Sequence, residues 1–276
     1  MESCRIDNGG VELALSVVGE GQDLLFVHGL RSSQPMWAPM VRSMQDRFRC
    51  WTLDLRGHGA SAWAPGGYHL AGFASDVSAA LRHIAAPTVG IGHSLGGMAV
   101  ADAAIAGHPN LRSAYLIEAP LFPVDGVAPP GFDQQLDLIR RYQQEGRSPG
   151  EFADLVSRAP APGGGTLGDR LVPEQLAAIG SAFADLDPEV MVARLDGSLR
   201  VEPRAPTFAV PTRVLAADPE LGPAVGPDAV AALADLSPAT EVRTILGLGH
   251  PMMMIRGFDE SVTADLVDWL EQLDLR

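Results

Sequence analysis

The chain has 276 residues, of which 46% are hydrophobic, which suits one domain or one domain that carries an insertion. Its net charge of −14 argues against nucleic acid or an anionic membrane surface as a partner, because both would repel it. The sequence has no apolar run near the roughly 18 residues that span a bilayer, no signal-peptide profile at its start and only two cysteines, so a cytoplasmic protein outside the membrane is expected.

The first part of the chain alternates predicted strands with predicted helices. Residues 11–18 alternate in polarity and predict an edge strand, whereas residues 23–29 form a continuous apolar run typical of a strand buried on both faces of a parallel sheet. Further strands are predicted at residues 48–54, 88–91 and 113–118, and helices at residues 34–45 and 68–84.

The pattern changes after residue 120, where no convincing strand is found up to residue 206. Two amphipathic helices are predicted there, at residues 132–144 and 173–183. The run of proline and glycine at residues 159–165 predicts a hinge or mobile loop between them. Alternation then resumes, with strands at residues 212–218 and 241–246 and helices at residues 228–236 and 258–273.

This order of elements predicts an α/β fold with a mostly parallel central sheet flanked by helices. Residues 1–120 and 207–276 are expected to form this core. Residues 121–206 are expected to be a helical cap inserted over the carboxyl edge of the sheet, where sites in such folds form.

A G-x-S-x-G motif, Gly92-His93-Ser94-Leu95-Gly96, stands between a predicted strand and a predicted helix. The strand has to reverse into the helix within a few residues, and the glycines lack side chains that would clash in so tight a turn. The turn would hold the Ser94 hydroxyl at a helix N-terminus, where free N–H groups and the helix dipole stabilise an oxyanion. Ser94 is therefore the candidate nucleophile.

A serine nucleophile needs a base, and His250 is the strongest candidate among the seven histidines. It follows the last predicted strand, at the sheet edge that also carries Ser94. His93 adjoins the nucleophile, but its side chain is expected to point away from the site. Neither the histidines nor the acidic residues have metal-site spacing, so no metal and no cofactor is expected. The histidines expected on the surface or at helix caps are His69, His83 and His108.

The elbow, the His28-Gly29 pair and the loop at residues 54–61 (Asp-Leu-Arg-Gly-His-Gly-Ala-Ser) together resemble the α/β-hydrolase superfamily. The loop is similar to the D-x-R-G-x-G-x-S pattern of that superfamily, and we interpret it as architectural, with Asp54 or Arg56 holding it by hydrogen bonds. In relatives the histidine of the His-Gly pair supports this loop. The resemblance covers most of the chain. It implies that the triad residues occur along the sequence in the order nucleophile, acid, histidine.

The resemblance also implies an oxyanion hole made of backbone N–H groups. One is that of Leu95, directly after the nucleophile. The other is that of Leu30, directly after the His-Gly pair. Neither position is dictated by its side chain, so both assignments follow from position alone.

Three carboxylates compete for the third place in the triad. Relatives usually place the acid after the strand that follows the cap, commonly as G-x-x-D, where this chain has Asp218 and Glu220 but no such glycine. Glu118 ends the strand before the cap, a placement similar to that in one subgroup of haloalkane dehalogenases and in the zearalenone lactone hydrolases. A buried carboxylate is costly unless it is paired, and an imidazolium is a suitable partner. Glu118 is our first choice, Asp218 the second and Glu220 the third.

These residues predict a serine hydrolase of carboxylic esters or lactones, in which Ser94 forms an acyl-enzyme and His250 takes its proton. Epoxide hydrolases and dehalogenases need a carboxylate nucleophile, so the serine counts against both. Cleavage of a C–C bond and haloperoxidase-like perhydrolysis use the same residues, and a ligand receptor on this fold is the alternative from another class. The apolar content of the cap predicts a small hydrophobic substrate, and a homodimer is compatible with the sequence.

Overall fold

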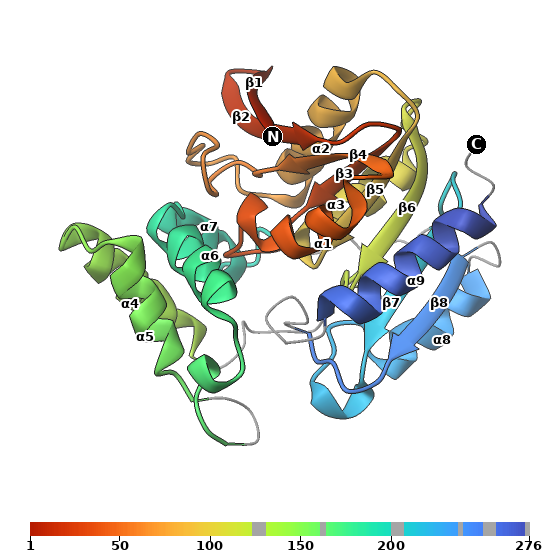
Figure 1. The fold of residues 1–276 in the computed structure, drawn as a ribbon. Helices are drawn as coiled ribbons and strands as arrows, with labels where there is room; N and C mark the ends of the chain where they lie inside the picture. The colour runs from red at the N-terminus through yellow and green to blue at the C-terminus, as the bar shows by residue number, and fades with distance from the viewer. Residues whose placement is uncertain (123–130, 161–163, 200–206, 237–239, 251–257, 274–276) are drawn as a thin grey trace.

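The computed structural model describes residues 1–122, 131–160, 164–199, 207–236, 240–250 and 258–273. Its centre is an eight-stranded sheet in the order β1-β2-β4-β3-β5-β6-β7-β8, flanked by helices (Figure 1). The strands from β3 to β8 run parallel, and β1 and β2 are antiparallel to their neighbours. The strands are β1 Glu2–Asn8, β2 Val11–Val18, β3 Gln22–Val27, β4 Phe48–Leu53, β5 Thr88–His93, β6 Leu111–Ile117, β7 Thr212–Ala217 and β8 Thr240–Ile245. This architecture confirms the predicted fold class.

Helices cover the two faces of the sheet in two groups. The sheet-flanking helices are α1 Ala38–Met44, which follows the short 3-10 helix η1 Gln34–Trp37, α2 Leu70–Ile84, α3 Leu95–Ile105, α8 Pro227–Leu236 and α9 Phe258–Gln272. Successive side chains of β3 point to opposite faces, so Leu25 joins the hydrophobic cluster of α2, α3 and α8. Phe26 joins the cluster of α1 and α9 on the other face. The continuous apolar sequence of β3 thus follows from its burial between two layers of helices.

The prediction of an edge strand at β2 is wrong, because β2 lies between β1 and β4. Its residues Leu13 to Ser16 are buried, whereas β1 is largely exposed and forms the edge of the sheet. The polar composition of β1 gives little strand signal, and the strand exists because its whole length pairs with β2. Within the described ranges, no helix is long and apolar enough to cross a membrane.

Helices fill the described part of the chain between β6 and β7. They are α4 Phe132–Gln144, α5 Pro149–Ser157, α6 Pro173–Ala184 and α7 Pro188–Leu195, with the 3-10 helix η2 Leu167–Asp169. Apart from an isolated bridge between Pro160 and Thr166, these described residues contain no strand, as expected. The predicted hinge includes residues 161–163, which lie outside the described part, so its mobility stays a prediction.

Helices α5 and α7 were not predicted, although both carry a helix-start signal. Ser148 and Glu151 form a capping box at the start of α5, and the Asp187 side chain accepts a hydrogen bond from the Glu189 N–H at the start of α7. In both helices a proline follows the capping residue, as is common at the first helical position. The two helices are short, so their hydrophobic periodicity was weak.

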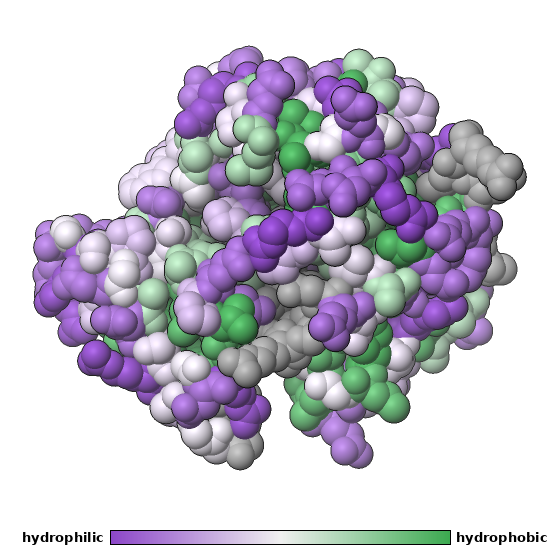
Figure 2. All heavy atoms as spheres, in the orientation of Figure 1, coloured by the Kyte–Doolittle hydropathy of each residue, from purple (hydrophilic) through white to green (hydrophobic). Residues whose placement is uncertain are grey.

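The inserted helices attach to the loop at residues 54–61. The Asp187 N–H donates to the carbonyl oxygen of Gly57 at 2.8 Å, and the Tyr68 hydroxyl donates to the Asp187 carboxylate. Figure 2 shows that the molecule is hollowed between the inserted helices and the part formed by β7, β8 and their loops, with apolar residues on both sides. The insertion therefore borders the carboxyl ends of the strands.

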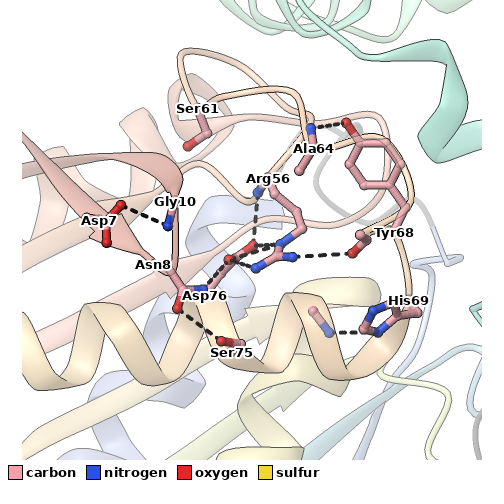
Figure 3. A network of polar contacts seen from close by, with 12 residues as sticks. Asp7, Asn8, Gly10, Arg56, Ser61, Ala64, Tyr68, His69, Ser75 and Asp76 are labelled. Carbon is pink, nitrogen blue, oxygen red and sulfur yellow. Dashed lines mark hydrogen bonds and ion pairs between the residues drawn. The ribbon is translucent and has the colours of Figure 1, made fainter.

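A buried ion pair organises this loop, as Figure 3 shows. The Arg56 guanidinium donates to both carboxylate oxygens of Asp76 in α2, at 2.7 to 3.1 Å, and Asn8 of β1 donates to the same carboxylate at 2.8 Å. Asp54 accepts hydrogen bonds from the Gln34 and Ala60 N–H groups. Both residues expected to hold the loop therefore do so.

Candidate active site

The nucleophile elbow is a sharp turn between β5 and α3. Ser94 has φ +49° and ψ −115°, a backbone conformation rare for residues other than glycine. A Cβ at Gly96 would lie 2.4 Å from the carbonyl oxygens of Val27 and His28, and one at Gly92 would lie 2.5 Å from the Gly96 carbonyl oxygen. Both flanking glycines are thus required by close backbone approach, and the turn places the Ser94 side chain at the N-terminus of α3.

A chain of hydrogen bonds connects Ser94, His250 and Glu118. The Ser94 Oγ lies 3.2 Å from His250 Nε2, and His250 Nδ1 lies 3.1 Å from Glu118 Oε2. If Nδ1–H donates to the carboxylate, Nε2 is left as the acceptor for the serine hydroxyl. The structure therefore brings three of the predicted catalytic residues together in the geometry of nucleophile, base and orienting acid.

Backbone donors fix the Glu118 carboxylate beside His250. Glu118 directly follows β6 with φ +49°, its side chain is fully buried, and it accepts the N–H groups of Ala217 at 2.7 Å and Ala224 at 2.6 Å. Burial opposes ionisation, but the hydrogen bonds from His250 and these two amides outweigh it and lower the pKa of Glu118. The carboxylate is thus ionised at neutral pH, as a partner of an imidazolium must be.

Asp218 and Glu220 have other contacts in the structure. The Asp218 carboxylate accepts the N–H groups of Gly247 at 2.9 Å and Glu220 at 3.0 Å, and these bonds lower its pKa. Its own N–H donates to the Leu248 carbonyl oxygen at 2.8 Å. Asp218 therefore ties the turn after β7 to the loop that leads to His250. The Glu220 side chain is exposed. Of the three candidate acids, Glu118 alone has a described contact with His250.

His93 does not point away from the site, so that expectation is wrong. Its ring stacks on that of His250 with centroids 5.4 Å apart, and its Nε2–H donates to the His250 carbonyl oxygen at 3.1 Å. Burial lowers the pKa of His93 to about 3, so the ring is neutral. The strand ends at His93, and the strained turn that follows breaks the simple alternation of side chains on which the expectation rested.

We expect His93 to position the base. His93→Phe keeps a ring against His250 but removes the N–H donor, and kcat should fall about tenfold because one hydrogen bond to the His250 loop is lost. Since the ring is neutral above a pH of about 3, the pH dependence of kcat between pH 5 and 9 should keep its shape. Steady-state kinetics and a melting curve of the variant check both points. An unchanged kcat would show that the contact has no effect on the base.

The segment after β3 runs directly against the elbow. A Cβ at Gly29 would lie 3.2 Å from the Ser94 Cβ. The Leu95 N–H is the first of α3 and has no intrahelical acceptor, and the Leu30 N–H has no hydrogen-bond acceptor within the described residues. Both predicted oxyanion donors thus belong to segments in contact with the nucleophile. Their catalytic role stays a prediction.

His28 and His69 have structural contacts. His28 Nε2 accepts the Leu55 N–H at 3.1 Å, so its Nδ1–H donates to the Gly29 carbonyl oxygen at 2.8 Å, and burial lowers its pKa to about 4. His28 thereby joins the end of β3 to the loop at residues 54–61, as the resemblance implied. His69 accepts the Gly72 N–H at the start of α2, a helix cap as expected.

Among the described residues, no three His, Cys, Asp or Glu side chains form a group able to hold a metal.

The chain belongs to the alpha/beta hydrolase family, whose model matches residues 24–264. It is 35% identical over 118 residues to 2-(acetamidomethylene)succinate hydrolase of Mesorhizobium japonicum, a match that covers 42% of each chain. It is 27% identical over 273 residues to a pimeloyl-[acyl-carrier protein] methyl ester esterase of Stenotrophomonas maltophilia, covering 94% of this chain and 96% of that one. Together with the site geometry, these matches define a hydrolase of this family.

Solved structures share the fold over almost the whole chain. A thermophilic esterase from Thermogutta terrifontis superposes with a TM-score of 0.72 at 25% identity, covering 99% of both chains. The enol-lactonase from Burkholderia xenovorans LB400 superposes with a TM-score of 0.71 at 22% identity, covering 95% of this chain and 98% of that one. The second likeness is one of fold alone.

Proposed function

We propose that the protein is a serine hydrolase that cleaves a carboxylic ester or lactone. The observation that carries this proposal is the hydrogen-bond chain from Ser94 through His250 to the buried Glu118. His250 takes the proton of Ser94 as its oxygen attacks the acyl carbon, and the ionised Glu118 stabilises the imidazolium that forms. His250 gives this proton to the departing ester oxygen as its bond to the acyl carbon breaks, and the alcohol leaves. Water, which loses a proton to His250, then attacks the acyl-enzyme, and the proton returns to Ser94 as the acid is released.

The negative oxygen of the tetrahedral intermediate is held by the N–H groups of Leu30 and Leu95. The first comes from the loop packed on the elbow and the second from the N-terminus of α3, where the helix dipole adds to the hydrogen bond. Because both donors are backbone groups of segments that pack at the elbow, they are in place before the reaction.

An ester is favoured by the relative that covers 94% of this chain, which is named for the hydrolysis of a methyl ester. An apolar cavity of about 430 Å³ lies next to Glu118 but is not lined by Ser94 or His250; its lining includes Ala119, Leu121, Phe122, Val225 and Leu233. The second candidate is a compound with an acetamido group, because the relative that is 35% identical over 118 residues is named for 2-(acetamidomethylene)succinate. Both reactions use the same triad, since each begins with attack on an acyl carbon.

A panel of methyl esters, lactones and N-acetyl enamines of varied chain length and ring size tests the proposal on the purified protein. We expect multiple turnovers of at least one ester or lactone, lost on inactivation of Ser94. If only the N-acetyl compounds are hydrolysed, the ester proposal is wrong and the second candidate is the substrate class. A single slow turnover of a tightly bound ligand would instead indicate a receptor.

A further inference from the structure

Arg31 stands directly after the predicted oxyanion donor Leu30, in an unusual conformation. Its φ of +61° is left-handed, which residues other than glycine rarely adopt. Two residues earlier, the chain touches the nucleophile, since a Cβ at Gly29 would lie 3.2 Å from the Ser94 Cβ. Two residues of extended chain span at most about 7 Å. The Arg31 Cα therefore lies within roughly 12 Å of the Ser94 Cβ.

The Arg31 guanidinium is held between the loop after β3 and the inserted helices. Its central carbon lies 5.0 Å from the centre of the Phe132 ring, and its Nη1 donates to the Gln135 side-chain oxygen. Both partners are in the first turn of α4. These contacts fix the position of the guanidinium without neutralising its charge.

No carboxylate in the described part of the chain pairs with Arg31, and its Nε is buried without an acceptor. Burial lowers the pKa of Arg31 to about 10, so the group still carries its charge at neutral pH. The more deeply buried Arg56 and Arg213, in contrast, are paired with Asp76 and Glu241. A partly buried cation with a free donor is costly, and an anion supplied from outside would remove that cost.

We propose that Arg31 binds a carboxylate carried by the substrate, so that the enzyme acts on acid esters rather than on neutral ones. This inference rests on the proposed function and assigns its substrate class. The Nε and Nη2 edge of a guanidinium matches a carboxylate with two parallel hydrogen bonds. The substrate would thus combine a scissile ester near Ser94 with a carboxylate a few bonds away, beside an apolar portion.

Two esters of matched shape test the proposal: monomethyl succinate, and methyl 4-methylpentanoate, in which an isopropyl group replaces the carboxylate. We expect the wild type to show at least a tenfold higher kcat/KM for the anionic ester. Arg31→Asn should lower the ratio of the two kcat/KM values about 10- to 100-fold, the effect of losing a hydrogen bond to a charged group. Asparagine tolerates the left-handed backbone better than most residues, so folding should be retained.

Two further variants separate charge from structure. Arg31→Lys keeps the charge but not the two parallel N–H donors of the guanidinium, so it should restore part of the ratio of the two kcat/KM values. Arg140→Asn removes an arginine of α4 that pairs with Glu189 on the surface, and it should leave both esters unaffected. A ratio that Arg31→Asn leaves unchanged, or a wild type that prefers the neutral ester, would overturn the proposal.

Binding of succinate to the Ser94→Ala variant, measured by calorimetry, tests Arg31 without turnover. We expect binding that the additional Arg31→Asn change weakens at least tenfold. If neither ester is hydrolysed but this binding is found, the proposed reaction is wrong and the anion site stands. If both esters are hydrolysed at equal rates and succinate does not bind, the proposed ester hydrolysis stands and the anion site at Arg31 is wrong.

Discussion

Ser94→Ala should lower kcat for a carboxylic ester at least 10³-fold, because it removes the oxygen that forms the acyl-enzyme. Its fold should stay intact, since the structural contacts of Ser94 are made by its backbone. The Ser94 N–H donates to the Ile117 carbonyl oxygen, and the Ser94 carbonyl oxygen accepts the Met98 N–H, both at 2.9 Å. Alanine can make both of these hydrogen bonds.

A fluorophosphonate probe measures the same property directly. The wild type should be labelled at Ser94, and Ser94→Ala should not be labelled at all. A melting curve of the variant serves as the control for folding. Labelling of another serine, or residual labelling of Ser94→Ala, would show that the elbow does not carry the nucleophile.

Glu118→Gln should lower kcat by about 10³ to 10⁴, the scale observed when a triad carboxylate becomes an amide. The amide cannot supply the negative charge that stabilises the His250 imidazolium. Its NH₂ group only donates, so it cannot replace the carboxylate oxygen that accepts the N–H group of Ala217 or of Ala224. Kinetics on a good ester, together with a melting curve, separate the loss of charge from any loss of folding.

Asp218→Asn is the matched control, because Asp218 also follows a strand of the sheet and also accepts backbone hydrogen bonds. Its effect on kcat should be tenfold or less, since it acts through the loop that carries His250 rather than on the ring. The opposite ranking, with Asp218→Asn nearly inactive and Glu118→Gln active, would return the acid to the strand after the insertion. If only Glu220→Gln were inactive, both assignments would be wrong.

Local pattern was enough to predict most of the elements and the elbow. The apolar runs of β3 and β4 report burial between two layers of helices, and amphipathic periodicity located α4. Gly92 and Gly96 are recognisable because close backbone approach excludes every side chain, a constraint that acts within a few residues. The signals of β1, α5 and α7 were weaker, because β1 is held by its pairing with β2 and because α5 and α7 are too short for a clear hydrophobic periodicity.

The tertiary structure alone determines which carboxylate faces His250. β6 and β7 are neighbours in the sheet, about 5 Å apart, so the acids that follow them start from adjacent positions at the same edge. Glu118 is directed inward by its left-handed backbone and by the N–H groups of Ala217 and Ala224, whereas Asp218 is engaged by the Gly247 N–H. Every residue except proline has a backbone N–H group, so the residue types do not reveal which N–H groups hold a carboxylate.

The tertiary structure also determines the direction of His93 and leaves Arg31 without a carboxylate partner among the described residues. The sequence predicts Ser94 and His250 as the nucleophile and its base because their chemistry and their positions after strands are local properties. Whether a neighbouring side chain contacts the base, or a cation lacks a partner, depends on loops brought together across more than a hundred residues. Such contacts result from packing, which is why they became apparent only in the folded protein.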